Sequence, residues 1–334
     1  MARWGYGLKL SIIIANYNYA HFVGQAIDSA LAVRWPDVEV IVIDDGSTDE
    51  SRAIIESYED RIRAIFQENA SQRVACNTAF EKSTGDWVIF LDSDDILDPS
   101  IAEEVSAIWS PGISKVQVQM DRIDRDGKPL HSVFPVYDPL PSPEKIKYWA
   151  INYTAYPCPP GSGNLYARSF LNKLFPVDDS CGTFVDSVLL TAAPLLGDVV
   201  TINKPLVKYR LHGGNDSNPL VSEGLFAREV QRAQQKFHFA QRVGRDVGID
   251  IPDKNFSKSL HTLQHRIASI KLSPALHPIA NDTRISVFFD AVKSTFFFDA
   301  MSLKRRFALL VWGSLTLFTP LPIAKKLVKL RFRY

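Results

Sequence analysis

The sequence contains few cysteines, and their positions argue against the structures that depend on cysteine. Cys76, Cys158 and Cys181 are the three cysteines among 334 residues, and their spacing matches neither a disulfide framework nor a zinc site. A reducing compartment suits such a chain. Residues 1–9, which precede the first apolar segment, are too few and too polar to form a secretion signal. We therefore expect a protein that stays in the cytoplasm.

Acidic residues are absent after Asp299, whereas eight lysines and arginines follow it. The uncharged stretch 307–324 in this region has 18 residues, and Pro320 and Pro322 shorten its helical part. A membrane-spanning helix needs about 20 apolar residues, so this stretch is not expected to span a bilayer. Basic flanks around an apolar helix instead predict that residues 301–334 lie peripherally on the inner face of the cell membrane. Packing on the rest of the protein or in a dimer is the alternative.

The remaining composition is that of a globular protein. Hydrophobic residues make up 46% of the chain, which is enough to bury a full core. Residues 1–300 carry 30 basic against 37 acidic residues, so nucleic acid is not an expected partner. We expect one large domain over residues 1–215, a helical extension over 216–300, and the tail.

Apolar runs alternate with helical patterns in the first hundred residues. Buried strands are predicted at 10–15, 38–43, 62–66 and 87–91, with helices at 22–31, 50–58 and 73–82 between them. This alternation predicts an α/β fold with a mainly parallel sheet flanked by helices. From Lys115 apolar and polar residues alternate, and Asp126-Gly127 predicts a hairpin turn, so the second half is expected to be mixed. Further strands are predicted at 199–202 and 206–211, and helices from about residue 221 onward.

Three carboxylates, those of Asp92, Asp94 and Asp95, directly follow the strand predicted at 87–91. Side chains two positions apart in an extended segment point the same way, so Asp92 and Asp94 converge and repel unless a cation lies between them. Oxygen ligands suit Mg²⁺ or Mn²⁺, which completes its shell with water and substrate phosphates. A solvated acidic loop is the alternative.

Polar residues also follow the first two predicted strands. Tyr17 comes after the first, and Asp44 and Asp45 come after the second. Ligands of open α/β sheets bind beyond the carboxyl ends of the strands, so these residues and the three carboxylates predict a binding site at that edge. Asp44 also suits the hydrogen bonds of its own loop.

Four segments, 11–18, 43–49, 85–95 and 209–212, resemble in order and spacing the glycosyltransferase family 2 domain. The resemblance covers residues 8–215. It implies the Rossmann-like GT-A fold, followed here by a C-terminal helical extension. It further implies an inverting transferase that uses Mn²⁺ or Mg²⁺ and moves a sugar from a nucleotide-sugar donor, with UDP preferred, to a glycan or lipid-linked acceptor. Such an enzyme would act in cell-surface polysaccharide or lipopolysaccharide synthesis.

The resemblance also assigns site residues. Donor nucleotide contacts fall on Ala15, Tyr17, Asp45, Asn77, Asp92 and Ser93. The metal falls on Asp94, Asp95 and His212, and the general base on Asp186, which is expected at a helix N-terminus. Cys76 stands where relatives often have arginine, so Arg73 is a further candidate for the diphosphate.

Other interpretations of these residues and of the chain remain. Asp186 would otherwise be a helix cap or first-turn acid, His212 the end of a strand, and Tyr17 a packing residue. The loop 156–164 could shape a pocket or be only a connection. A nucleotidyltransferase, which would release pyrophosphate, and a non-catalytic sugar-nucleotide-binding module are the alternative functions.

Overall fold

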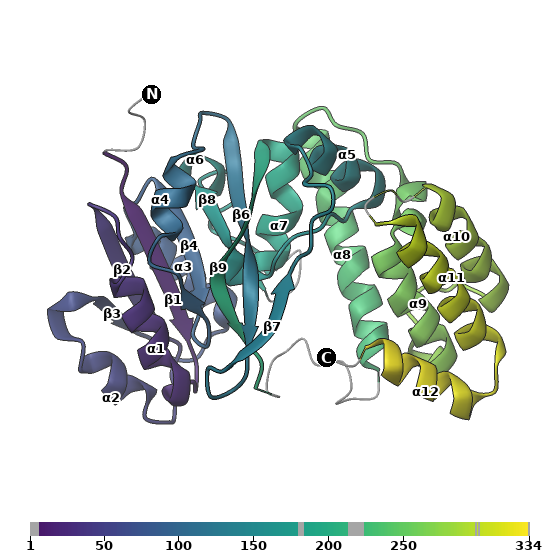
Figure 1. The fold of residues 1–334 in the computed structure, drawn as a ribbon, viewed down its shortest axis with the longest axis horizontal. Coiled ribbons are helices and arrows are strands. Elements are labelled where there is room, and N and C mark those ends of the chain that lie inside the picture. The colour runs from purple at the N-terminus through teal and green to yellow at the C-terminus, as the bar shows by residue number, and fades with distance from the viewer. Residues whose placement is uncertain (1–6, 180–183, 213–223, 298, 300, 333–334) are drawn as a thin grey trace. The chain divides into compact units, whose positions relative to one another are not determined.

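The computed structural model describes residues 7–179, 184–212, 224–297, 299 and 301–332 (Figure 1). The chain divides into two compact units. The sheet unit comprises residues 1–147 and 157–212, and the helical unit comprises residues 148–156 and 213–334. A short segment from the middle of the sequence, 148–156, therefore belongs with the C-terminal helices.

Four parallel strands form the first half of the sheet. They are β1 (Leu10–Asn16), β2 (Val38–Asp44), β3 (Arg63–Phe66) and β4 (Trp87–Asp92), in the spatial order β3-β2-β1-β4. The helices between them are α1 (Ala20–Leu31), α2 (Ser51–Glu56) and α3 (Gln72–Lys82). β1, β2 and β4 are largely apolar and buried, as is typical of parallel strands covered on both faces, whereas β3 at the edge is more exposed. Asn16 pairs with Asp44 and Ala15 with Asp92, so the polar ends of these strands meet at one edge.

The second half of the sheet is mixed, as predicted. Its strands are β5 (Ile96–Leu97), β6 (Ile113–Ile123), β7 (Pro129–Phe134), β8 (Asn164–Ala167) and β9 (Asp198–Arg210). β8 lies antiparallel between β4 and β6, and β9 runs parallel to β6. The remaining helices of this part are α4 (Ile101–Ser106), α5 (Pro143–Tyr153), α6 (Arg168–Leu171) and α7 (Val185–Leu196).

The predicted α/β fold with a mainly parallel sheet flanked by helices is confirmed, with one difference in its strands. The two strands predicted at 199–202 and 206–211 are one strand, β9, which bends where its register with β6 shifts. The predicted hairpin turn forms between β6 and β7, and Gly127 in it has a φ of +85°. Glycine adopts such a backbone conformation without steric cost.

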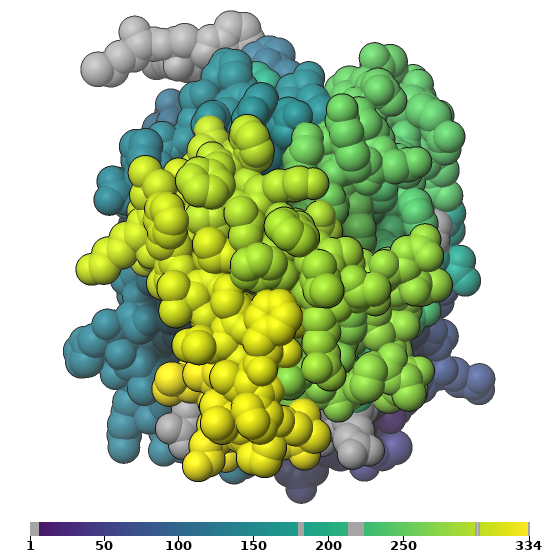
Figure 2. Space-filling view, turned by 90° about the vertical axis from the view of Figure 1, so that its right-hand side faces the viewer, coloured from purple at the N-terminus to yellow at the C-terminus, as the bar shows by residue number. Residues whose placement is uncertain are grey.

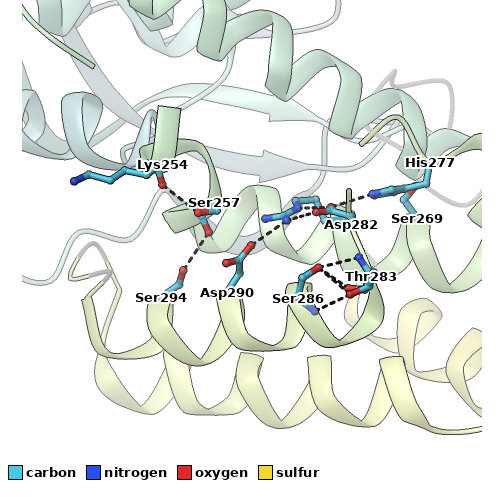
Figure 3. Close-up of polar contacts among 10 residues, drawn as sticks. Lys254, Ser257, Ser269, His277, Asp282, Thr283, Ser286, Asp290 and Ser294 are labelled. Carbon is cyan, nitrogen blue, oxygen red and sulfur yellow. Dashed lines mark hydrogen bonds and ion pairs between the residues drawn. The ribbon is translucent and has the colours of Figure 1, made fainter. Parts of the chain in front are cut away.

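The described part of the helical unit contains five long helices: α8 (Leu225–Asp246), α9 (Leu260–Leu272), α10 (Arg284–Phe297), α11 (Leu303–Phe318) and α12 (Leu321–Arg331). The end of α5 belongs to it, because Trp149 donates a hydrogen bond to Asp299 at 2.6 Å. Arg266 of α9 is buried and pairs with Asp282 at 2.6 Å and with Asp290 at 3.0 Å. His277 lies 3.0 Å from Asp282 in the same network (Figure 3). This network fixes α10 and the segment before it on α9.

The basic, apolar C-terminal segment is divided between α11 and α12 and packs within the helical unit. Leu317, Ala324 and Val328 are buried, and α11 and α12 both contact α9. Within the described ranges, no helix combines the length and the apolar character that crossing a bilayer requires.

Candidate active site

The edge where β1, β2 and β4 end carries the residues expected to bind a nucleotide. Ser93, just beyond β4, donates its hydroxyl hydrogen bond to the carbonyl oxygen of Ala15 at 2.8 Å. Tyr17 follows β1, and 46% of its surface is exposed. The structure therefore brings Ala15, Ser93 and the exposed ring of Tyr17 to one edge of the sheet.

Asp44 and Asp45, at the end of β2, have different partners. Asp44 accepts hydrogen bonds from the side chain of Asn16 at 2.8 Å and from the backbone of Ser47 at 3.0 Å. This confirms the expected role of Asp44 within its own loop. Asp45 holds the segment before α3: its Oδ1 accepts from Gln67 at 2.6 Å and from the Ala70 amide at 2.9 Å, and its Oδ2 accepts from the Ser71 amide at 2.9 Å. A carboxylate oxygen has two lone pairs, so one on Oδ2 remains beyond these bonds.

Asp94 and Asp95 are neighbours in sequence but are held differently. Oδ2 of Asp94 lies 2.8 Å from Nε2 of His212. Asp95 is buried, and it accepts hydrogen bonds from the Ser162 hydroxyl at 2.7 Å and from the Arg210 amide at 3.0 Å. Burial, followed by the nearby charge of Asp94, raises the pKa of Asp95 to about 8 although these donors oppose the shift. Both oxygens of Asp95 are thus already bonded to the protein.

Arg210, the last residue of β9, holds the backbone of the acidic loop 92–95 in place. It is fully buried, and its Nε donates to the carbonyl oxygen of Asp94 at 2.8 Å. Its other nitrogens donate to the carbonyl oxygen of Arg125 at 3.0 Å and to the Gln25 side chain at 2.8 Å. Sequence reasoning included Arg210 in a motif without a role. The structure shows that it fixes the backbone that presents Asp94.

Asp92 and Asp186 approach each other at Gly161. A Cβ built on Gly161 would lie 2.8 Å from Oδ2 of Asp186 and 3.1 Å from Oδ2 of Asp92. Asp186 lies in the first turn of α7, whose N-cap is Phe184, so the N-cap alternative does not hold for Asp186. Burial, then the charges of Asp186, Asp95 and Asp94, raise the pKa of Asp92 well above its ordinary value.

The loop 156–163 closes this side of the site, and a buried polar network beneath it sets its position. Asn164 donates to the carbonyl oxygens of Pro160 at 2.8 Å and Gly161 at 3.1 Å. The amine of Lys115, which is fully buried, donates to the Asn164 side chain at 2.9 Å and to Gln117 at 3.0 Å. Burial lowers the pKa of Lys115 to about 8. The loop therefore contributes Gly161 and Ser162 to the site.

Sequence reasoning missed Lys115, Ser162 and Asn164. A signal for the network was present in β6, where Lys115, Gln117 and Gln119 alternate with apolar residues that are themselves buried. When a strand is buried on both faces and carries polar residues on one face, the neighbouring strands or loops must supply hydrogen-bond partners for those residues.

Asn77 and Arg73, expected near the diphosphate, contact the segment after α6. The Asn77 amide donates to the carbonyl oxygen of Val177 at 3.0 Å and accepts from its N–H at 2.8 Å. Arg73 donates to the same carbonyl at 3.3 Å. Cys76, which lies between Arg73 and Asn77 in the sequence, is buried. Burial raises the pKa of its thiol, and the charges of Asp186, Asp92 and Asp45 raise it further. The donor contact of Asn77 stays a prediction.

A divalent cation fits the donor set of Asp94 and His212. Among the residues that the structure describes, no three His, Cys, Asp or Glu side chains form a ready metal site. A carboxylate oxygen and an imidazole nitrogen 2.8 Å apart nevertheless suit an ion that takes its other ligands from water and phosphate. Each oxygen of Asp95 accepts one bond from the protein, and its place among the metal ligands stays a prediction.

Comparisons with known proteins agree with this arrangement. The family model described as glycosyl transferase family 2 matches residues 11–175. An uncharacterized glycosyltransferase of Nostoc sp. is 34% identical over 215 residues, which are 63% of this chain and 66% of that protein. One of Rickettsia prowazekii is 35% identical over 144 residues, 42% of this chain and 45% of that protein. The matches thus span less than two thirds of the length of these relatives.

A solved structure shares the fold over nearly the whole chain. The crystal structure of S. aureus TarS residues 1–349 in complex with UDP-GlcNAc covers 98% of this chain and 90% of that chain, with a TM-score of 0.58 and 17% identity. At that identity the likeness supports the fold alone. On the family match and the related sequences, the chain belongs to glycosyltransferase family 2, whose members are glycosyltransferases of the GT-A fold.

Proposed function

We propose that this protein transfers a sugar from a nucleoside diphosphate donor to a hydroxyl group of a glycan or lipid-linked acceptor, with inversion at the anomeric carbon. One observation carries the proposal: the carboxylates of Asp186 and Asp92 meet at Gly161, at the edge of the sheet where Ala15, Tyr17 and Ser93 also lie. A candidate base therefore lies beside the residues assigned to the donor.

Asp186 is the group that takes the proton from the acceptor hydroxyl. A carboxylate in this position removes the proton as the new glycosidic bond forms, which contributes roughly 10² to 10⁴ in rate. Inversion requires attack from the side opposite the leaving diphosphate, so Asp186 faces the acceptor and the acidic loop 92–95 faces the diphosphate. Gly161 keeps the space between them open because it has no side chain.

Asp94 and His212 are the residues that would hold Mn²⁺ or Mg²⁺. When bound, the ion would neutralise the charge that develops on the leaving diphosphate. Asp95 acts by keeping the loop in place through Ser162 and the Arg210 amide. Arg210 keeps the Asp94 backbone fixed.

The donor is a uridine nucleotide in this proposal. Oδ2 of Asp45 has acceptor capacity for the imide N–H of uracil, and Tyr17 offers a ring for its face. UDP-GlcNAc, the ligand named for S. aureus TarS, is a suitable first donor to test. The product acts in cell-surface polysaccharide or lipopolysaccharide synthesis.

The first experiment separates donor binding from catalysis. Thermal unfolding of the wild type is measured with UDP, dTDP, GDP and CMP, each with Mn²⁺ or with a chelator. A ligand at 100 times its Kd adds about 2.7 kcal/mol to stability. The shift should be largest with UDP, should require the metal and should disappear in Asp94→Asn. If no nucleotide shifts the transition, the donor site is refuted.

The second experiment tests the base. Asp186→Asn should abolish transfer, measured as released nucleoside diphosphate, while the thermal shift by UDP stays as in the wild type. Glu144→Gln is the control, because Glu144 is also a first-turn acid, in α5, and lies outside the site. If Asp186→Asn and Glu144→Gln lost the same amount of stability and the same amount of activity, Asp186 would only stabilise the N-terminus of its helix. Release of pyrophosphate would instead identify a nucleotidyltransferase.

A further inference from the structure

One side of the helical unit exposes a continuous apolar surface, here called the apolar face. On α11 it consists of residues spaced three or four apart, which lie on one side of a helix. The apolar face comprises Ile285, Phe289 and Phe296 of α10 and Leu303, Phe307, Val311, Leu315 and Phe318 of α11. Figure 2 shows this side of α10, α11 and α12. The exposed fractions are large, for example 56% for Phe289, 58% for Val311 and 57% for Phe318.

The two helices form one surface because aromatic rings join them at both ends. Phe296 and Phe307 have ring centroids 6.1 Å apart at one end. Phe288, which contacts Phe289, lies 5.6 Å from Phe318 at the other. The apolar face therefore extends along the length of both helices. A continuous apolar surface of this kind marks an interaction site, since soluble proteins rarely leave one in water.

The charged residues of α11 and α12 are all basic. Lys304 and Arg305 are exposed at the start of α11, and Lys325, Lys326 and Lys329 are exposed on α12. The acids of α10 and the preceding segment, Asp290 and Asp282, are paired with Arg266. No acid follows Asp299 in the sequence. The basic groups are thus not balanced by acids of the same helices.

We propose that the apolar face docks on a lipid bilayer that contains anionic lipids, with α10 and α11 lying in the plane of the interface. Aromatic and aliphatic side chains enter the headgroup and acyl boundary, and the basic residues of α11 and α12 meet the lipid phosphates. A second copy of the chain fits less well, because a two-fold contact through this face would bring the unbalanced positive charge of both copies to one interface. The proposal extends the prediction for residues 301–334 to α10 and assigns the contact to one face.

Vesicle binding of the full chain tests this proposal directly. The wild type is floated with vesicles of phosphatidylcholine alone or mixed with phosphatidylglycerol. Val311→Glu is compared with Val136→Glu, because Val136 lies in the sheet unit and is 57% exposed, nearly the same as Val311. We expect the wild type and Val136→Glu to bind the anionic vesicles, and Val311→Glu to bind at least roughly ten-fold more weakly.

A charge variant tests the basic residues separately. Removing Lys325, Lys326 and Lys329 by substitution with glutamine should weaken binding by about five-fold for each lysine at low salt, and should reduce the preference for anionic vesicles. The thermal shift by UDP should be unchanged in Val311→Glu. A loss of vesicle binding can therefore be distinguished from a loss of donor binding.

Three results would overturn the proposal. The wild type could leave both kinds of vesicle unbound. The two valine variants could bind equally. Sedimentation equilibrium could show a wild-type dimer that Val311→Glu dissociates and Val136→Glu does not, which would assign the apolar face to a second copy.

Discussion

Nε2 of His212 lies 2.8 Å from Oδ2 of Asp94, and this contact joins the residues after β9 to a loop 118 positions earlier in the chain. The imidazole is packed against Phe22, with ring centroids 4.9 Å apart. Since the ring is held in place, its nitrogen is oriented before any cation binds. The pair is therefore the part of the site best suited to contribute two metal ligands.

His212→Gln should raise the Mn²⁺ concentration that half-saturates the UDP-dependent thermal shift by roughly ten-fold or more. The reason is the loss of a nitrogen ligand that is oriented in advance. His21→Gln is the matched control, because His21 also contacts Phe22 but is exposed. Identical Mn²⁺ titrations for both variants would remove His212 from the metal site.

Gly161→Ala should lower kcat by about ten- to a hundred-fold while changing the melting temperature little. The new methyl group would lie 2.8 Å from the Asp186 carboxylate, which is the end of a side chain and can move aside. A small displacement of a reacting group is costly for catalysis. Steady-state kinetics and thermal unfolding of the same preparation check this prediction.

Gly163→Ala provides the contrast for this substitution. Its methyl group would lie 2.6 Å from Cβ of Pro159 and 3.1 Å from Sδ of Met120, and the proline ring cannot turn away. We expect a clear loss of stability, on the order of 1 to 3 kcal/mol, from the forced shift. The hypothesis fails if Gly161→Ala loses stability in the same way and keeps its kcat.

Lys115→Met should reveal a pH-dependent contribution of the buried amine. Burial lowers the pKa of Lys115 from 10.5 to about 8 in the folded protein. Between these values the unfolded chain binds more protons than the folded one, so the stability of the wild type rises with pH. Relative to Lys115→Met, the wild type should gain roughly 2 kcal/mol of unfolding free energy between pH 8 and 10.

Urea unfolding at a series of pH values measures this difference. Gln117→Leu is a useful comparison, because it removes one acceptor of the amine at 3.0 Å and retains the lysine. That variant should be less stable at every pH and should still gain stability as pH rises. A difference between wild type and Lys115→Met that is constant from pH 8 to 10 contradicts the prediction.

Glu39→Gln should lose stability at neutral pH by about 1 to 3 kcal/mol. Burial alone would raise the pKa of Glu39, but hydrogen bonds from Ser11, Thr84 and Lys9 lower it from 4.5 to about 2. Because the folded-state pKa is depressed, the ionised carboxylate stabilises the protein above pH 4.5, and this contribution is lost as pH falls towards 2.

Acid titration of unfolding compares this variant with Glu56→Gln, which breaks an exposed ion pair with Arg52. The exposed pair should contribute less than about 1 kcal/mol. The stability gap between wild type and Glu39→Gln should narrow between pH 4.5 and 2. A gap that persists at pH 2 would mean that packing, and not the charge, accounts for it.

The parallel strands β1, β2 and β4 were predictable from sequence because each is a largely apolar run with a polar end. The strand predicted at 87–91 is β4, and the one predicted at 38–43 is β2, each with one further residue. The placement of Asp44, Asp92 and Asp94 at one edge follows from parallel pairing alone. Hydrophobic periodicity and strand direction were therefore enough to predict the parallel strands and the positions of the acidic residues in the site.

The part of the site formed by Lys115, Ser162 and Asn164 depends on contacts between residues far apart in the sequence. β8 has four residues and follows a proline- and glycine-rich loop, so its apolar pattern is too short to detect. Asn164 begins this strand and meets Lys115 from 49 positions earlier, and Ser162 meets Asp95 from 67 positions earlier. No local pattern encodes such pairs, which become visible only when β8 is placed between β4 and β6.

The chain leaves the helical unit after residue 156 and returns to it after residue 212, and this order has a consequence during synthesis. Trp149 and Tyr153 find their partners Asp299 and Phe297 respectively 150 and 144 positions later. At cellular translation rates these two aromatic residues wait roughly 10 to 30 s for those partners to be made. The sheet unit can thus be completed on the ribosome while the segment 148–156 still lacks these partners in the helical unit.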